Sequence, residues 1–95
     1  MKLIKEIEIE ENPNYGRWYI ERYKCPHCNK VLVEYWEKDG TTLYVFKIDP
    51  IGCKHFEVLT TYESFREIEE AYGDKVAYLF YDHHDDSTIA IISRT

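Results

Sequence analysis

The sequence predicts an α+β fold in which one helix packs on an antiparallel β-sheet. Runs rich in β-branched and aromatic residues recur along the chain between turn-forming residues, as is typical of short strands. A single segment, residues 62–72, has instead the three-to-four-residue apolar spacing of an amphipathic helix. The chain has 95 residues and contains no internal repeat or long linker. We therefore expect one domain over residues 1–95.

Each predicted strand follows from its local pattern. Residues 4–10 alternate isoleucine with glutamate, the period of a half-buried strand. Two further strands are joined by Asp39-Gly40, a hairpin signal. Residues 76–81 are almost continuously apolar, which predicts a strand covered on both faces. The predicted strands are residues 4–10, 17–24, 31–37, 42–48, 56–59, 76–81 and 88–93, with turns at 12–16, 38–41, 49–52 and 82–87.

The helix has a predicted start and a predicted end. Thr60 and Glu63 fit a capping box, in which each side chain hydrogen-bonds the backbone of the other residue. Gly73 is placed to end the helix in a left-handed conformation. We expect the helix and the hairpin that follows it to form the part of the domain over residues 60–95.

Cysteines and histidines at two places form a candidate metal site. Cys25 and Cys28 are separated by two residues, and Asn29 follows where a left-handed backbone is needed, which Asn tolerates. Cys53 and His55 follow a predicted hairpin that returns the chain to the same end of the sheet. Three thiolates and one imidazole fill a tetrahedral zinc shell, and a closed shell of this kind is structural. We expect one zinc ion, which can contribute about 10–16 kcal/mol of apparent binding free energy to folding.

The fourth ligand stays open at this point. It is His55, or another histidine such as His27, His83 or His84, or water. A redox role for Cys25 and Cys28 would need a helix starting at the motif, but a strand is predicted there.

The segment 17–59 resembles a zinc ribbon, in which two knuckles at the ends of β-hairpins each donate two ligands. The first knuckle, Cys25-Pro26-His27-Cys28, matches the ribbon pattern well. The second, Cys53-Lys54-His55, has one residue between its ligands where ribbons usually have two, and no glycine follows either knuckle. The resemblance implies recognition of nucleic acid, or a contact role in the transcription and translation machinery.

Charge is distributed unevenly along the chain. The net charge of −6 argues against a surface that binds a phosphate backbone throughout. Residues 15–31 nevertheless contain four basic residues and one acidic residue, whereas residues 62–74 contain five acidic residues and one basic residue. A basic zinc end with aromatic side chains would suit single-stranded nucleic acid or an acidic protein surface. The candidate binding residues are Arg17, Trp18, Arg22, Lys24, Lys30 and Lys54.

These observations lead to one leading hypothesis and two alternatives. We expect a structural-zinc protein that binds another protein and catalyses no reaction. The first alternative is binding of RNA or single-stranded DNA. The second is a metal-dependent hydrolase, with an open zinc position or a second ion held by the segment Asp82-His83-His84-Asp85-Asp86, which otherwise is a solvated turn.

Location and association are expected from further features. The sequence has no signal-peptide pattern and no membrane-spanning apolar run, which predicts a cytoplasmic or otherwise intracellular protein without membrane contact. The absence of glutamine, with many glutamates and lysines, is typical of thermophilic proteins. The edge strand 4–10 offers a surface for homodimer formation.

Overall fold

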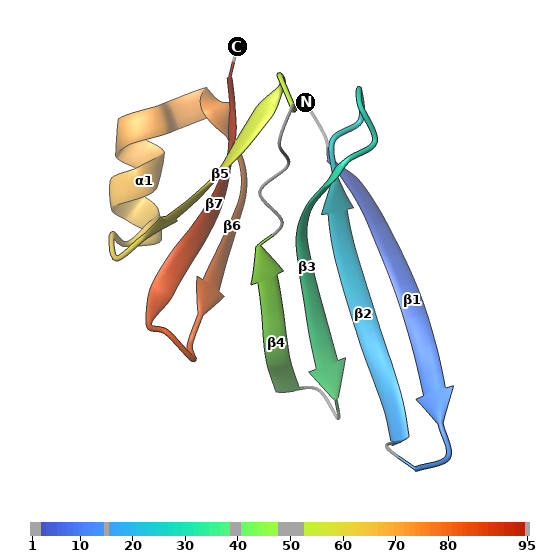
Figure 1. Ribbon diagram of the computed structural model, residues 1–95. Coiled ribbons are helices and arrows are strands. Elements are labelled where there is room, and N and C mark those ends of the chain that lie inside the picture. The colour runs from blue at the N-terminus through green and yellow to red at the C-terminus, as the bar shows by residue number, and fades with distance from the viewer. Residues whose placement is uncertain (1–2, 15, 39–40, 48–52, 95) are drawn as a thin grey trace.

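The structure, a computed structural model, describes residues 3–14, 16–38, 41–47 and 53–94. Its strands form two antiparallel sheets, one of four strands in the order β1-β2-β3-β4 and one of three in the order β5-β7-β6 (Figure 1). The strands are β1 (Ile4–Asn12), β2 (Gly16–Lys24), β3 (Val31–Lys38), β4 (Thr41–Lys47), β5 (Phe56–Thr61), β6 (Val76–Asp82) and β7 (Ser87–Ser93). Helix α1 (Phe65–Tyr72) continues into a short 3₁₀ turn, η1 (Gly73–Lys75). The predicted α+β class with antiparallel strands and one helix is confirmed, and the strands are divided between two sheets.

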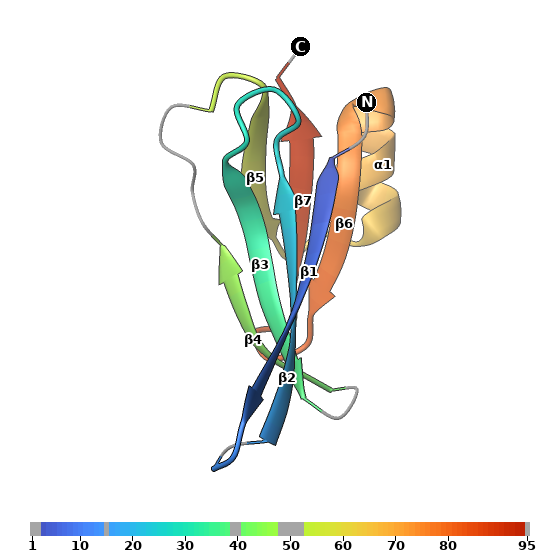
Figure 2. The ribbon, with the colours of Figure 1, turned by 90° about the vertical axis from the view of Figure 1, so that its right-hand side faces the viewer.

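The two sheets face each other and share a core (Figure 2). Leu32, Val33 and Tyr35 from the four-stranded sheet pack with Phe56 and Ile89 from the three-stranded sheet, all of them buried. The core reaches the cysteines at one end, because Cys25 and Cys53 belong to the same buried cluster. The candidate site is therefore continuous with the packing between the sheets.

Strand β7, the central strand of its sheet, is buried from Ser87 to Ile92. Successive residues of a strand point to opposite faces. Accordingly Ile91 packs in the core between the sheets, whereas Ala90 and Ile92 pack beneath α1. The sequence predicted such two-sided cover for residues 76–81. That segment is β6, which is only partly buried because it lies at the edge of its sheet.

Helix α1 begins later than predicted. Its N-cap is Ser64, whose side chain accepts a hydrogen bond from the N–H of Glu67, while the Glu67 carboxylate accepts one from the N–H of Ser64. The predicted cap at Thr60 is wrong, because Thr60 pairs with Ile89 as part of β5. The helix ends as predicted at Gly73, whose φ is +55° and whose N–H donates to the carbonyl of Glu69.

The predicted turns and the predicted dimer surface have different outcomes. The Asp39-Gly40 turn and the turn at 49–52 lie outside the described residues. Strand β1 is an edge strand on which Ile7 and Ile9 are half exposed, and homodimer formation through it stays a prediction. Among the helices of the described ranges, none has the length and apolar character needed to cross a bilayer.

Candidate metal centre

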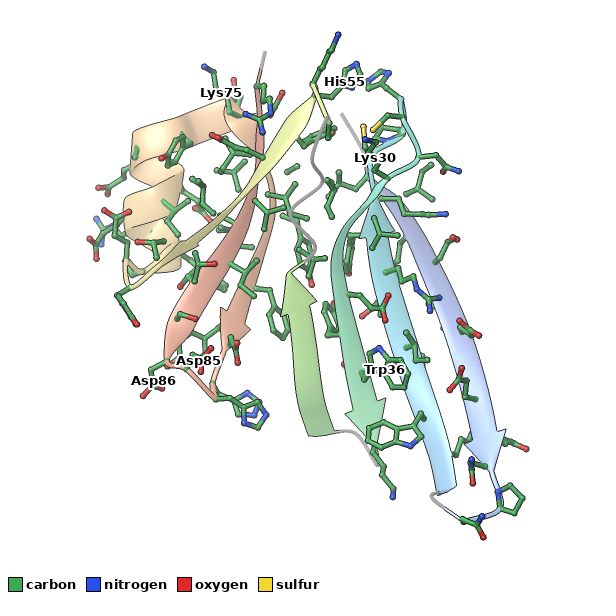
Figure 3. The ribbon with its side chains drawn as sticks, viewed as in Figure 1. Lys30, Trp36, His55, Lys75, Asp85 and Asp86 are labelled. Atoms are coloured by element: carbon green, nitrogen blue, oxygen red, sulfur yellow. The ribbon has the colours of Figure 1, made fainter. Side chains whose placement is uncertain are left out.

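The structure brings together Cys25, Cys28, Cys53 and His55. One ligand atom from each lies within 4.8 Å of each of the others. We call these four residues the ligand cluster. His55, one of the four, lies at the top of the view in Figure 3, at the end of the sheets where β5 begins. The cluster is consistent with a site for one metal ion.

The first two ligands come from a tight turn between β2 and β3. The N–H of Asn29 donates to the carbonyl of Cys25 at 2.9 Å, and the N–H of Cys25 donates to the carbonyl of Lys30 at 3.0 Å. Asn29 has a φ of +63°, the left-handed conformation predicted for it. This backbone reversal directs Cys25 and Cys28 to one side of the turn.

The other two ligands precede β5. Lys54 and His55 lie in a bend before β5, and with this bend the single-residue spacing is sufficient for both Cys53 and His55 to reach the cluster. Arg94 fixes this segment from the other end of the chain. Its N–H donates to the carbonyl of His55 at 2.9 Å, and its Nε donates to the carbonyl of Phe56 at 3.1 Å. The sequence offers no signal for this role of Arg94, since it depends on the pairing of β5 with β7.

The sulfur atoms have the spacing of metal ligands. The three cysteines are free, and Sγ of Cys28 lies 3.6 Å from Sγ of Cys53. Zinc–sulfur bonds of about 2.3 Å in a tetrahedron place two sulfurs ~3.8 Å apart, whereas a disulfide needs about 2.05 Å. The distance therefore matches shared coordination far better than a disulfide.

His55 supplies an independent indication of a missing partner. Its Nδ1 is buried and has no hydrogen-bond partner among the described residues. Buried nitrogen atoms are nearly always hydrogen-bonded or coordinated, because an unpaired one loses its hydration without compensation. A metal ion bound by Nδ1 and the three sulfurs would satisfy this atom.

The pKa values of two thiols are shifted in opposite directions. Burial raises the pKa of Cys53, but the N–H groups of His55 and Phe56, together with the neighbouring thiols, lower it below its usual value. For Cys28 the N–H of Lys30 lowers the pKa, but burial and the thiols of Cys25 and Cys53 raise it above its usual value. Backbone N–H groups directed at the Cys53 sulfur thus stabilise a thiolate, the form that binds metal.

None of the alternative histidine ligands, His27, His83 and His84, belongs to the ligand cluster. The ring of His27 stacks on that of His55 with 4.5 Å between centroids, but His27 is not one of the four clustered residues. His83 and His84 stack on each other in the turn after β6, next to Asp85 and Asp86. This turn lies at the end of the three-stranded sheet away from His55 (Figure 3). The structure therefore does not bring His83 and His84 to the ligand cluster.

The predicted basic surface is largely neutralised. Arg22 bonds two carboxylates, Glu8 at 2.7 Å and Glu34 at 2.8 Å. Lys24 bonds Glu6 at 2.7 Å. The alternating glutamates of β1 thus pair with basic residues of β2 across the sheet.

The remaining predicted binding residues are divided between the ligand cluster and the start of β2. Lys30 follows Cys28 by two residues, and Lys54 lies between Cys53 and His55. Both lysines are exposed. Arg17 and Trp18 lie at the start of β2, roughly 25 Å from Cys25 at about 3.3 Å per residue. Trp18 packs there edge-on against Trp36, with ring centroids 5.9 Å apart. The structure therefore does not bring the six predicted binding residues into one surface.

A tyrosine cluster between the two sheets could not be identified from sequence. The hydroxyl of Tyr35 lies 2.8 Å from that of Tyr78 and donates to that of Tyr23 at 3.3 Å. Tyr23 and Tyr78 also stack, with centroids 4.1 Å apart. Because Tyr23 and Tyr35 come from the four-stranded sheet and Tyr78 from the other, these contacts join the two sheets. The nine tyrosines of the sequence were the only signal for such a cluster.

Comparison of the chain with protein-family models, curated proteins and solved structures gave no significant match. The resemblance to zinc ribbons is therefore supported only as far as the ligand cluster itself, a group of three cysteines and one histidine consistent with a metal site.

Proposed function

We propose that this protein binds one structural zinc ion through Cys25, Cys28, Cys53 and His55, and that it acts by binding another protein. The observation that carries the proposal is the convergence of four donor atoms, one from each residue, within 4.8 Å of one another. The buried, unpaired Nδ1 of His55 supports it. Zinc is the metal that best suits three thiolates and an imidazole.

A structural role for the ion follows from the ligand count and from its place in the fold. Four protein ligands complete a tetrahedral shell and leave no position for substrate or a reactive water molecule. The ligand pairs also come from different parts of the chain, one between two strands of the four-stranded sheet and one leading into the three-stranded sheet. A bound ion would fasten the sheets together at this end.

Binding of a protein is favoured over binding of nucleic acid by the distribution of charge. Arg22 and Lys24 are engaged by carboxylates, so they have little capacity left for phosphates. Exposed tyrosine and phenylalanine side chains beside the helix are, in contrast, typical of protein contacts.

Metal analysis tests this proposal. Protein purified without chelators is expected to contain one zinc ion per chain. Replacing Cys25, which is buried, by serine should remove the zinc and lower the free energy of unfolding by several kcal/mol, since metal binding energy contributes directly to folding. His27→Ala is the matched control, because it removes a neighbour of His55 from outside the ligand cluster and should leave the zinc bound. Less than stoichiometric zinc, or unchanged stability of Cys25→Ser, would contradict the structural-zinc role.

A further inference from the structure

An open groove lies where helix α1 begins, beside the turn between β6 and β7. It has a volume of about 510 Å³. Aromatic and acidic side chains dominate its lining: Tyr62, Phe65, Tyr81, Glu63, Glu67 and Asp86. We call it the acidic aromatic groove. It is remote from the metal centre, since Asp86 and His55 lie at opposite ends of the three-stranded sheet (Figure 3).

The aromatic side chains of the groove are unusually exposed. Tyr62 is 85% exposed, Tyr81 48% and Phe65 40%. A single exposed aromatic residue needs no explanation, but several that line one concavity are typical of a binding surface. Tyrosine is also among the residues that most often contribute a large share of binding energy at protein interfaces.

The charge of the groove specifies the chemistry of its ligand. Three of its lining residues are acidic, and no lysine or arginine is among the described residues that line it. Cations bind favourably over the faces of aromatic rings. A carboxylate beside such a ring adds a charge-assisted hydrogen bond. Rings and carboxylates together therefore suit a guanidinium or ammonium group.

The walls of the groove are held in place by hydrogen bonds. The hydroxyl of Thr88 donates to the carbonyl of Glu63 at 2.9 Å, which attaches the segment before the helix to β7. The hydroxyl of Tyr81 donates to Asp86 at 2.7 Å. The capping box at Ser64 fixes the first turn of α1. A site formed in advance loses little conformational entropy when it binds.

We infer that the acidic aromatic groove binds an arginine- or lysine-rich segment of a partner protein, with a basic side chain seated among Tyr62, Phe65 and Tyr81. The inference rests on the proposed function, because it assigns a surface and a partner chemistry to the interaction role. Complementary charge supports it: the protein carries −6 overall, and the groove is part of its acidic region.

Titration with a basic peptide tests the inference. The probe is a fluorescein-labelled peptide of alternating arginine and glycine, added to zinc-loaded protein, and the readout is fluorescence anisotropy. Tyr62→Ser and Glu63→Gln should each weaken binding, the former by about tenfold, as expected for loss of a cation–ring contact of roughly 1–2 kcal/mol. Glu69→Gln is the matched control. It makes the same change in net charge on an exposed position of α1 outside the groove and should bind as the unmodified protein does.

Other outcomes would overturn the inference. These are no binding by zinc-loaded protein, equal loss of binding in Glu63→Gln and Glu69→Gln, or free spermidine competing as well as the unlabelled peptide at equal charge. The last result would mean a site for small cations. Metal content is measured on the same samples. Absent zinc therefore shows failure of the proposed metal role, whereas bound zinc with no peptide binding shows failure of the groove alone.

Discussion

The buried Nδ1 of His55 and the hydroxyls of the tyrosine cluster differ in how they are satisfied. The histidine nitrogen has no partner among the described residues. The hydroxyl of Tyr35, in contrast, contacts two other tyrosine hydroxyls. The first arrangement indicates an external ligand. The second is a closed network that stabilises the fold.

The tyrosine cluster predicts how stability depends on alkaline pH. Burial, together with hydrogen bonds to the hydroxyls of Tyr23 and Tyr78, raises the pKa of Tyr35 above its usual value, and burial does the same for Tyr78. The folded state then holds protons that the unfolded state releases near pH 10. Stability should be complete below that pH and should fall above it, by up to about 1.4 kcal/mol per pH unit for each such group.

Replacing Tyr35 tests this dependence. Tyr35→Phe should cost about 1 kcal/mol at neutral pH through lost hydrogen bonds, and it should make the alkaline fall in stability less steep. The measurement is urea unfolding, followed by circular dichroism, from pH 7 to 11. Tyr62→Phe removes a hydroxyl from a residue that is 85% exposed and should change neither quantity. An unchanged alkaline slope in Tyr35→Phe would show that Tyr35 does not carry the effect.

At the scale of single residues, much of the candidate metal centre could be predicted from the sequence. The spacing of Cys25 and Cys28, and the position of Cys53 after a hairpin, were enough to expect convergence. The choice between His55 and the other histidines was not available, because it depends on where each turn lies in three dimensions. His83 and His84 are exposed in a turn at the far end of β6, and sequence distance does not show this.

At the scale of the elements, helix α1 shows how a local signal can be present twice. Thr60 and Glu63 match the capping-box pattern, and so do Ser64 and Glu67. The second pair forms the cap, because β5 continues to Thr61 and pairs with β7. Tertiary pairing thus decides between two motifs of similar local preference.

Substitution of the two candidate caps should separate them. Ser64→Ala is expected to lower the free energy of unfolding by about 1 kcal/mol, because the N–H of Glu67 loses its acceptor. Thr60→Ala removes the hydroxyl of an exposed strand residue and should cost no more than about 0.5 kcal/mol. The check is chemical denaturation of both variants. A larger loss of unfolding free energy in Thr60→Ala than in Ser64→Ala would indicate that the helix is capped at the predicted position, Thr60.

The ends of the strands were predictable to within two residues. Patterns of alternation located β1, and runs of aromatic and β-branched residues located β2, β3 and β7. The pairing of β5 with β7 was not predicted, since it joins segments separated by the helix and β6. This unpredicted pairing places β7 at the centre of its sheet and gives it the two-sided burial expected for β6.

At the scale of the whole molecule, the two sheets share one core, and this predicts cooperative unfolding. Ile91 is fully buried in the three-stranded sheet, whereas Trp18 and Trp36 belong to the four-stranded sheet. Ile91→Ala should lower the free energy of unfolding by about 2–4 kcal/mol through lost burial and an internal cavity. Tryptophan fluorescence should report this loss in the other sheet as fully as circular dichroism does.

A control and a contrary result define this test. Ile7→Ala changes an isoleucine that is 53% exposed and should have an effect below about 1 kcal/mol. If the tryptophan transition of Ile91→Ala stays where it is in the unmodified protein while circular dichroism shifts, the sheets unfold separately. The prediction of one domain over residues 1–95 would then be wrong.

The order of the strands has a consequence for the time course of folding. The four-stranded sheet is built from consecutive segments that end at Lys47, so all of its pairings are local in sequence. During synthesis the N-terminal part of a chain folds first. Cys25 and Cys28 are therefore expected to be in place on a finished hairpin before Cys53 and His55 leave the ribosome. All four ligands precede Phe56, the first residue of the second sheet, so metal capture needs only the first 55 residues and is expected to come before that sheet is complete.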